Sequence, residues 1–200
     1  MSYNKGKNEK IKDLLSRIVD NRGKTPHTSP IKSLIYRNPL IEINAIATSN
    51  KFPDLASIKK YVDDETYQNW FRNGHPIFED ILVPTVGTIG LVAMMGKEKG
   101  SIAQNLIALR FNNEKIIQEY AFYYMKSINF TRQLYNLDIG GVQPSIKVPH
   151  LLNSEIYYPH LKVQRKIANI LSSLDDKIEL NNKINQNLEE LAQTLYKRWF

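Results

Sequence analysis

The sequence contains no cysteine and offers no long apolar run. Without cysteine the chain can form neither disulfides nor thiolate metal sites, which fits a protein of a reducing compartment. Residues 1–12 are polar and basic, with no apolar run behind them that would make a signal peptide. The longest uncharged stretch, 81–96, is broken by Pro84, Gly87 and Gly90 and is shorter than the ~20 residues that a membrane helix needs. These absences predict a soluble, cytoplasmic protein with no membrane partner.

A recognisable set of catalytic residues is missing as well. Histidines stand at scattered positions, without the paired spacing of a metal site. Gly23-Lys24-Thr25 resembles the end of a phosphate-binding loop, but Ile18 stands where that loop has its first glycine. The acidic residues around Asp54 and Asp63 have the wrong spacing for a metal-dependent nuclease. We therefore expect no catalytic residue and no metal ligand, and we predict that the chain is not an enzyme by itself.

Positive charge is concentrated near the start of the chain. The formal net charge is +7, and residues 1–37 alone hold nine Lys or Arg against three Asp or Glu. A basic segment of this kind suits a polyanion, and nucleic acid is the commonest one in the cytoplasm. A solvated surface that merely raises the isoelectric point is an equally good interpretation.

The spacing of apolar residues predicts a mixed α+β fold. Helical spacing covers 11–19 and 115–128, and strand patterns cover 40–47, 81–86, 91–95, 102–111 and 155–158. These elements do not alternate as in a doubly wound sheet. We expect one globular domain, residues 1–159, followed by a helical arm, residues 160–200.

The arm carries an apolar stripe with heptad spacing. Ile167, Leu174, Leu188 and Leu195 occupy one seam position, and Ile170, Ile184 and Leu191 occupy the other. Asn181 interrupts the first series, as a buried asparagine does when it fixes register. An arm of this length exceeds what the domain's own core needs, so we favour pairing with a partner over packing against the same chain.

Two glycine-containing loops have alternative interpretations. Gly87-Thr88-Ile89-Gly90 is most simply a turn between strands, because glycine supplies positive φ. The alternative is a loop that places the Thr85 and Thr88 hydroxyls against DNA. Residues 140–145, Gly-Gly-Val-Gln-Pro-Ser, leave the same two possibilities open.

A series of motifs in order along the chain identifies a family. It begins with Asp80-Ile81-Leu82, Gly87-Thr88-Ile89-Gly90 and Ala103-Gln104-Asn105. It continues with Gly140-Gly141-Val142-Gln143-Pro144-Ser145, Ile156-Tyr157-Tyr158-Pro159, Gln164-Arg165-Lys166-Ile167-Ala168 and the ending Leu195-Tyr196-Lys197-Arg198-Trp199-Phe200. In this series the chain resembles a DNA specificity subunit of a type I restriction-modification system. Full-length members carry two target-recognition domains and two helical regions, so this chain resembles a half-subunit.

The resemblance implies a target-recognition domain that binds double-stranded DNA and docks methyltransferase subunits, which methylate adenine. The chain would need no cofactor, since the methyltransferase subunit binds S-adenosylmethionine, and restriction subunits would join the assembly. A homodimer of antiparallel coiled-coil arms would hold two readers on a symmetric split target. The alternatives are a stand-alone nuclease or methyltransferase and a coiled-coil adaptor with no DNA role.

From these considerations we predict two sets of binding residues. The DNA-binding set is Arg22, Lys24, Thr85, Thr88, Gln143, Ser145 and Lys147. The dimerisation set is Ile170, Leu174, Asn181, Ile184, Leu188, Leu191 and Leu195.

Overall fold

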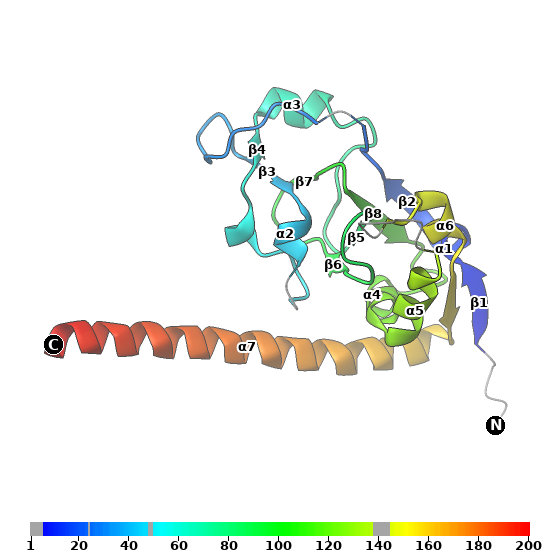
Figure 1. Cartoon of the computed structure of the whole chain (residues 1–200). Coiled ribbons are helices and arrows are strands. Elements are labelled where there is room, and N and C mark those ends of the chain that lie inside the picture. Colours follow the sequence, from blue (N-terminus) through cyan, green and yellow to red (C-terminus); the bar gives the residue numbers. More distant parts are fainter. Residues whose placement is uncertain (1–5, 24, 48–49, 138–144) are drawn as a thin grey trace.

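A globular part and one long helix make up the chain. The computed structural model describes residues 6–23, 25–47, 50–137 and 145–200. Helix α7 (Leu161–Trp199) begins against the globular part and extends well beyond it (Figure 1). The sequence prediction of a mixed α+β fold with a long C-terminal helix is confirmed. Within the described ranges, no helix combines the length and the apolar character that crossing a bilayer requires.

The described strands form three sheets. A four-stranded antiparallel sheet has the order β2-β8-β5-β6, with bounds Leu15–Val19, Leu106–Phe111, Ile81–Pro84 and Ala93–Met94. A three-stranded sheet has the order β4-β3-β7, with bounds Tyr61–Val62, Asn38–Ile41 and Ser101–Ile102. The antiparallel pair β1 (Lys7–Lys10) and β9 (Glu155–Tyr158) brings the start of the domain beside the start of α7.

Short helices cover these sheets. They are α1 (Ile11–Leu14), α2 (Ile43–Ile46), the 3-10 turn η1 (Leu55–Ser57), α3 (Asp64–Asn69), α4 (Gln118–Lys126), α5 (Ile128–Tyr135) and α6 (Val148–Asn153). Side-chain caps fix where three of them begin, and at η1 the Asp54 side chain accepts from the Ala56 N–H. Asp63 accepts from the Thr66 backbone N–H at α3, and Ser127 accepts from Phe130 at α5.

Strand β8 separates two layers of the core. Ile107, Leu109 and Phe111 point into one cluster with α4, α5 and α6, and this cluster includes Ala168 of α7. Leu106 and Ala108 point into a second cluster on the other face, with α2. Because successive strand residues face opposite sides, a strand covered on both faces reads as a continuous apolar run. Helix α7 contributes to this buried core through its first turns, where Ala168 is buried and Ile167 packs against the first cluster.

The structure corrects three sequence predictions. Residues 11–19 are not one helix, because after one turn the chain becomes β2 and pairs with β8. The strand predicted over 40–47 ends at Ile41 and gives way to α2. The strand predicted over 102–111 is divided by a turn in which the Leu106 N–H donates to the Ala103 carbonyl. Apolar runs this short fit either period, so tertiary pairing decides between them.

Candidate nucleic-acid interface

Polar and aromatic side chains line a hollow where the segment after β2 meets the segment after α3. The hollow has a volume of about 690 Å³. Trp70 lines it and also lines a smaller hollow of about 100 Å³ with Gln104 and Asn105. We call this surface the Trp70 face and define it by Asn21, Arg22, Asn69, Trp70, Arg72, Asn73, Gln104 and Asn105. It combines amides, guanidinium groups and the indole of Trp70, which is 42% exposed, and the carboxylate of Asp20 also lines the larger hollow.

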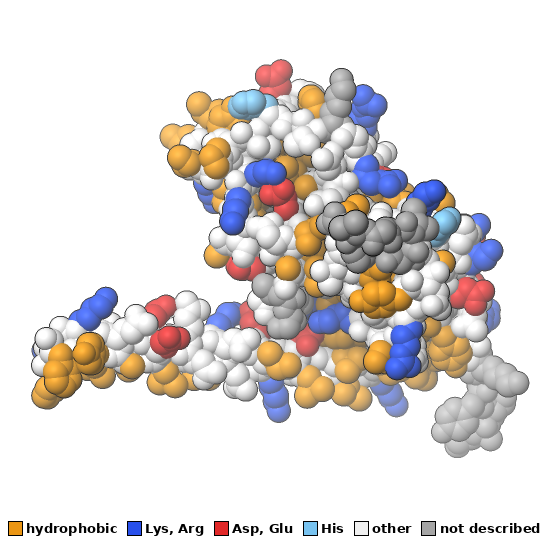
Figure 2. Space-filling model, viewed as in Figure 1, with side chains coloured by type: hydrophobic (Ala, Val, Ile, Leu, Met, Phe, Trp, Pro, Cys, Tyr) orange, Lys and Arg blue, Asp and Glu red, His pale blue; other side chains and the backbone are white. Residues whose placement is uncertain are grey.

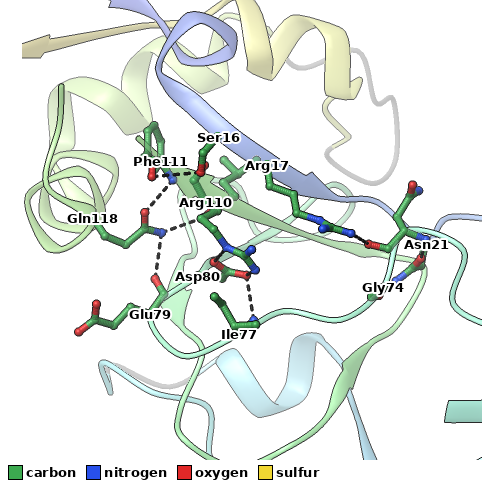
Figure 3. Close-up of polar contacts among 12 residues, drawn as sticks. Ser16, Arg17, Asn21, Gly74, Ile77, Glu79, Asp80, Arg110, Phe111 and Gln118 are labelled. Atoms are coloured by element: carbon green, nitrogen blue, oxygen red, sulfur yellow. Dashed lines mark hydrogen bonds and ion pairs between the residues drawn. The ribbon is translucent and has the colours of Figure 1, made fainter. Parts of the chain in front are cut away.

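The two segments of the Trp70 face are held together by hydrogen bonds (Figure 3). The Asn21 side chain donates to the Gly74 carbonyl at 2.9 Å and accepts from the Asn73 N–H at 3.0 Å. Arg17 donates to the Asn73 carbonyl at 3.1 Å. The amide of Asn21 is therefore used internally, and it positions its neighbours Arg22 and Asn73 on the surface.

Arg22 is oriented by a neighbouring carboxylate. Its Nε and Nη2 donate to the two carboxylate oxygens of Asp20 at 2.8 and 2.7 Å. The side-chain hydrogen bond from Arg22 is the largest cause that lowers the pKa of Asp20. The Arg22 side chain is still 41% exposed, so it can bind an anion while Asp20 fixes the plane of the guanidinium group.

A buried polar network supports the segment that follows the Trp70 face (Figure 3). Arg110 on β8 donates two hydrogen bonds of 2.8 Å to Asp80, which also accepts from the Ile77 N–H at 2.9 Å. The Gln118 amide donates to the Glu79 and Leu109 carbonyls, each at 2.9 Å. Glu79 is held with a positive φ of 72°, a conformation that a non-glycine residue rarely adopts. This network fixes the path of the chain from the Trp70 face back to the sheet.

A second group of predicted residues gathers at the end of β5. Thr88 and Lys147 are exposed, and Val86 pairs with Ser145 in an isolated β-bridge. Thr85 is buried, and its hydroxyl donates to the Asn105 carbonyl at 3.3 Å. Because this hydroxyl is buried and bonded within the protein, it is poorly placed to contact the edge of a DNA base. Asn105 links this group to the Trp70 face, because it belongs to both.

Two predicted DNA-binding residues, Lys24 and Gln143, lie outside the described residues. Conversely, sequence reasoning missed Trp70, Arg72 and their amide neighbours. They lie in the polar stretch 48–79, whose periodicity is too weak to predict more than loops and a short helix. The available signal was the run Asn69-Trp70-Phe71-Arg72-Asn73 itself, in which an indole and a guanidinium stand between two amides.

The arm is fastened at one end. The Gln164 side chain is fully buried and bonds the Ile117 N–H and the carbonyls of Lys115 and Pro159. Further along, the Tyr123 hydroxyl donates to Asp175 at 2.9 Å, and burial followed by this bond raises the pKa of Tyr123. Lys51 Nζ donates to Ser172 Oγ at 3.0 Å. These contacts tether the first half of α7 to the domain.

The predicted dimerisation stripe is exposed along α7. The aliphatic members, Ile170, Leu174, Ile184, Leu188, Leu191 and Leu195, are between 46% and 63% exposed. Hydrophobic side chains gather along the edge of the arm that faces away from the globular part (Figure 2). The helix therefore does not bury its stripe against its own domain.

Comparison with known proteins decides the family. A family profile described as "Type I restriction modification DNA specificity domain" matches residues 6–190. The chain belongs to this family. The resemblance inferred from the ordered motifs is therefore confirmed.

Curated relatives of the family are named specificity subunits of type I restriction enzymes. The MjaIX subunit of Methanocaldococcus jannaschii is 38% identical over 85 residues, which cover 42% of this chain and 20% of that protein. The HindI subunit of Haemophilus influenzae is 32% identical over 102 residues, which cover 50% of this chain and 22% of that protein. The matched region thus spans about a fifth of each relative's length.

Solved structures of the family share the fold. The S subunit of the type I restriction-modification system from M. genitalium superposes with a TM-score of 0.62 at 16% identity, covering 90% of this chain and 41% of that one. The HsdS subunit from Thermoanaerobacter tengcongensis gives 0.60 at 15% identity, covering 88% and 38%. In each case this chain corresponds to about two fifths of the neighbour.

Proposed function

We propose that this chain reads DNA sequence for a type I restriction-modification complex. It binds double-stranded DNA through the Trp70 face and the adjoining Thr88, Ser145 and Lys147, and it directs adenine methylation and restriction by partner subunits. The observation that carries the proposal is the Trp70 face on a chain of the DNA specificity family. The chain itself is not catalytic in this proposal.

The side chains of the Trp70 face suit the two tasks of a DNA-reading surface. Arg22, Arg72 and Lys147 supply cations for phosphates, which set position and orientation on the duplex. Asn69 and Gln104 carry amides, the group that pairs bidentately with adenine in the major groove. Trp70 offers a flat apolar surface for a sugar or a thymine methyl group.

In the proposed assembly, α7 pairs with the α7 of a second copy. Support comes from the exposed stripe and from the tether at Gln164, which fixes each reader to its arm. A two-fold pair of readers would recognise a split target with inverted half-sites. Methyltransferase subunits, which bring S-adenosylmethionine, and restriction subunits complete the complex in the cytoplasm.

The experiment is a binding titration of the purified chain against duplex DNA at several salt concentrations, by fluorescence anisotropy. Trp70→Ala and Arg72→Ala should weaken binding, and loss of the Arg72 phosphate contact should reduce the salt slope by about 0.9. Arg165→Ala is the matched control, since Arg165 is an exposed arginine on α7 away from the Trp70 face. Equal affinities for all three variants, each with a wild-type melting curve, would contradict the proposed interface.

A second experiment addresses the target and the alternatives. Sequencing of methylated adenines in cells that express the chain with its methyltransferase subunit should reveal a split motif with inverted symmetry. Trp70→Ala should abolish that methylation, whereas Arg165→Ala should leave it intact. Hydrolysis or methylation of DNA by the purified chain alone, with magnesium or S-adenosylmethionine, would favour a stand-alone enzyme instead.

A further inference from the structure

Two adjacent seam positions near the middle of the arm are polar. Along the seam of α7, Val163, Ile167, Ile170 and Leu174 are followed by Lys177 and Asn181, and then aliphatic residues resume at Ile184, Leu188, Leu191 and Leu195. Lys177 and Asn181 are both exposed in the single chain. If two arms pair as proposed above, these polar groups enter the interface, and their position restricts how the arms can align.

Parallel pairing would place identical residues opposite each other. Lys177 would then face Lys177 of the second copy inside the seam, and two ammonium groups would be brought together where water is excluded. Like charges in such a setting repel strongly, because the effective dielectric constant there is lower than in water. The seam therefore disfavours a parallel pair.

In an antiparallel pair, each residue of one seam position meets a residue of the other position. Given the antiparallel orientation that the family resemblance implies, we infer that two copies of α7 pair in the register that sets Lys177 against Asn181 of the second copy. The ammonium group then donates to the asparagine side-chain oxygen at two symmetric places beside the two-fold axis. In the same register Leu174 meets Ile184, Ile170 meets Leu188, Ile167 meets Leu191 and Val163 meets Leu195. Every aliphatic seam residue in this stretch thus faces an aliphatic partner.

Shifting the arms by one heptad spoils this match. In one direction Lys177 meets Leu188 and Asn181 meets Ile184. In the other direction Lys177 meets Leu174 and Asn181 meets Ile170. Either shift buries a charge and an amide against aliphatic side chains without a partner, which is strongly unfavourable. Lys177 and Asn181 therefore select one register, in the way that a buried asparagine does in other coiled coils.

The same register gives the end of the arm a place to bind. Arg198 falls opposite His160 of the second copy, and Trp199 comes level with Pro159. His160 and Pro159 line a hollow of about 470 Å³, together with Glu9 and Glu114. Trp199 is 78% exposed in the single chain. Lys7 and Lys115 also line the hollow, and Lys115 pairs with Glu9 at 3.2 Å, so its charges largely cancel. We assign this hollow to the apolar side chain of Trp199 of the second copy.

Disulfide trapping tests the register, since the chain has no cysteine and engineered thiols are the only ones present. The full-length double variant Ile170→Cys/Leu188→Cys should form covalent dimers in a glutathione buffer. Ile170→Cys/Leu195→Cys reports the shifted register, and Ile170→Cys alone reports parallel pairing, because only there does position 170 meet itself. These two controls should give at least tenfold less covalent dimer. Preferential trapping by either control would overturn the inference.

Sedimentation equilibrium separates failure of the register from failure of the pairing on which it depends. Particles of twice the 23.2 kDa chain mass, combined with trapping by a control pair, would refute the register and leave the homodimer standing. Particles of 23.2 kDa at high micromolar concentration would refute both pairing and register, while the DNA titration would still stand on its own.

Two further variants test the named residues. Lys177→Leu/Asn181→Leu should remove the preference, so that the 170/188 and 170/195 cysteine pairs trap dimers to a similar extent. Unchanged discrimination would show that other residues set the register. Trp199→Ala should weaken the dimer at least tenfold, whereas Tyr135→Ala, at an aromatic residue on α5 that is 56% exposed, should not. Equal effects would refute the docking of Trp199.

Discussion

The ion pair between Asp80 and Arg110 offers the sharpest test of how the fold supports the Trp70 face. Asp80 is 2% exposed and Arg110 is 27% exposed. Asp80→Asn preserves the shape of the side chain but removes the charge and one acceptor. Arg110 would lose at least one of its two 2.8 Å bonds, and the Ile77 N–H would lose or share its acceptor.

The magnitude follows from these contacts. Breaking a buried ion pair by removing one partner costs about 3–5 kcal/mol, because the other charge remains buried. Arg110 keeps partial access to water, which lowers the expected loss to about 2–4 kcal/mol of unfolding free energy. Urea denaturation followed by circular dichroism measures this loss. The double variant Asp80→Asn/Arg110→Met should recover part of it, since no unpaired charge is left behind.

The pair between Arg37 and Asp64 is the matched control. It has the same fork geometry, with Arg37 Nε and Nη2 donating to the two oxygens of Asp64 at 2.9 and 2.5 Å. Both side chains are largely exposed, at 61% and 48%. Exposed pairs contribute little, so Asp64→Asn should change stability much less than Asp80→Asn. Equal losses for the two variants would refute the reasoning from burial.

Three further predictions concern the same framework. Burial lowers the pKa of His75 below its usual value of 6.5, so the unfolded chain binds the proton more tightly than the folded chain. The free energy of unfolding should therefore fall as pH drops through 6.5. His75→Phe should flatten that pH dependence, measured by denaturant unfolding at successive pH values. Gln118→Leu should cost about 2–4 kcal/mol, measured by urea denaturation, because it removes the side-chain acceptor of the Phe111 N–H and the donor to two carbonyls. Gly90→Ala should lower the melting temperature more than Gly23→Ala. Both glycines have positive φ, but a methyl group at Gly90 would lie 2.6 Å from Thr131 Cγ2, whereas a methyl group at Gly23 would face open space.

Strong periodic patterns predicted the coarse architecture. The heptads of α7, the strand at 155–158 and the helical spacing within 115–128 all rest on local repetition, and all three elements form. Segments 11–19 and 40–47 were assigned wrongly because their apolar residues are too few to separate the two periods. For those segments, pairing with β8 and packing under the core decide the outcome.

The candidate interface was harder to predict than the fold. Arg22, Thr88 and Lys147 were chosen for charge or for a glycine-rich context, and they lie exposed in the structure. Trp70 and Arg72 were missed because what brings them beside Arg22 is a set of hydrogen bonds between segments fifty residues apart in sequence. Only the folded structure shows that the side-chain amide of Asn21 makes the hydrogen bonds that join these two segments.

In the proposed homodimer, the hydrogen bonds of the buried Gln164 side chain would have a geometric consequence for the spacing of the two half-sites. Because the buried amide locks the root of α7 to the domain, the angle of each reader about the helix axis is fixed by the number of residues between root and dimer centre. One inserted residue would swing a reader by about 100° and disable it, whereas a whole inserted heptad would nearly restore its facing. Because both arms of the homodimer would carry the insertion, such a heptad would increase the separation of the two readers by about 21 Å, the rise of roughly six base pairs. In the proposed homodimer, the length of the arm would thus set the spacer length of the recognised sequence, independently of which bases are read.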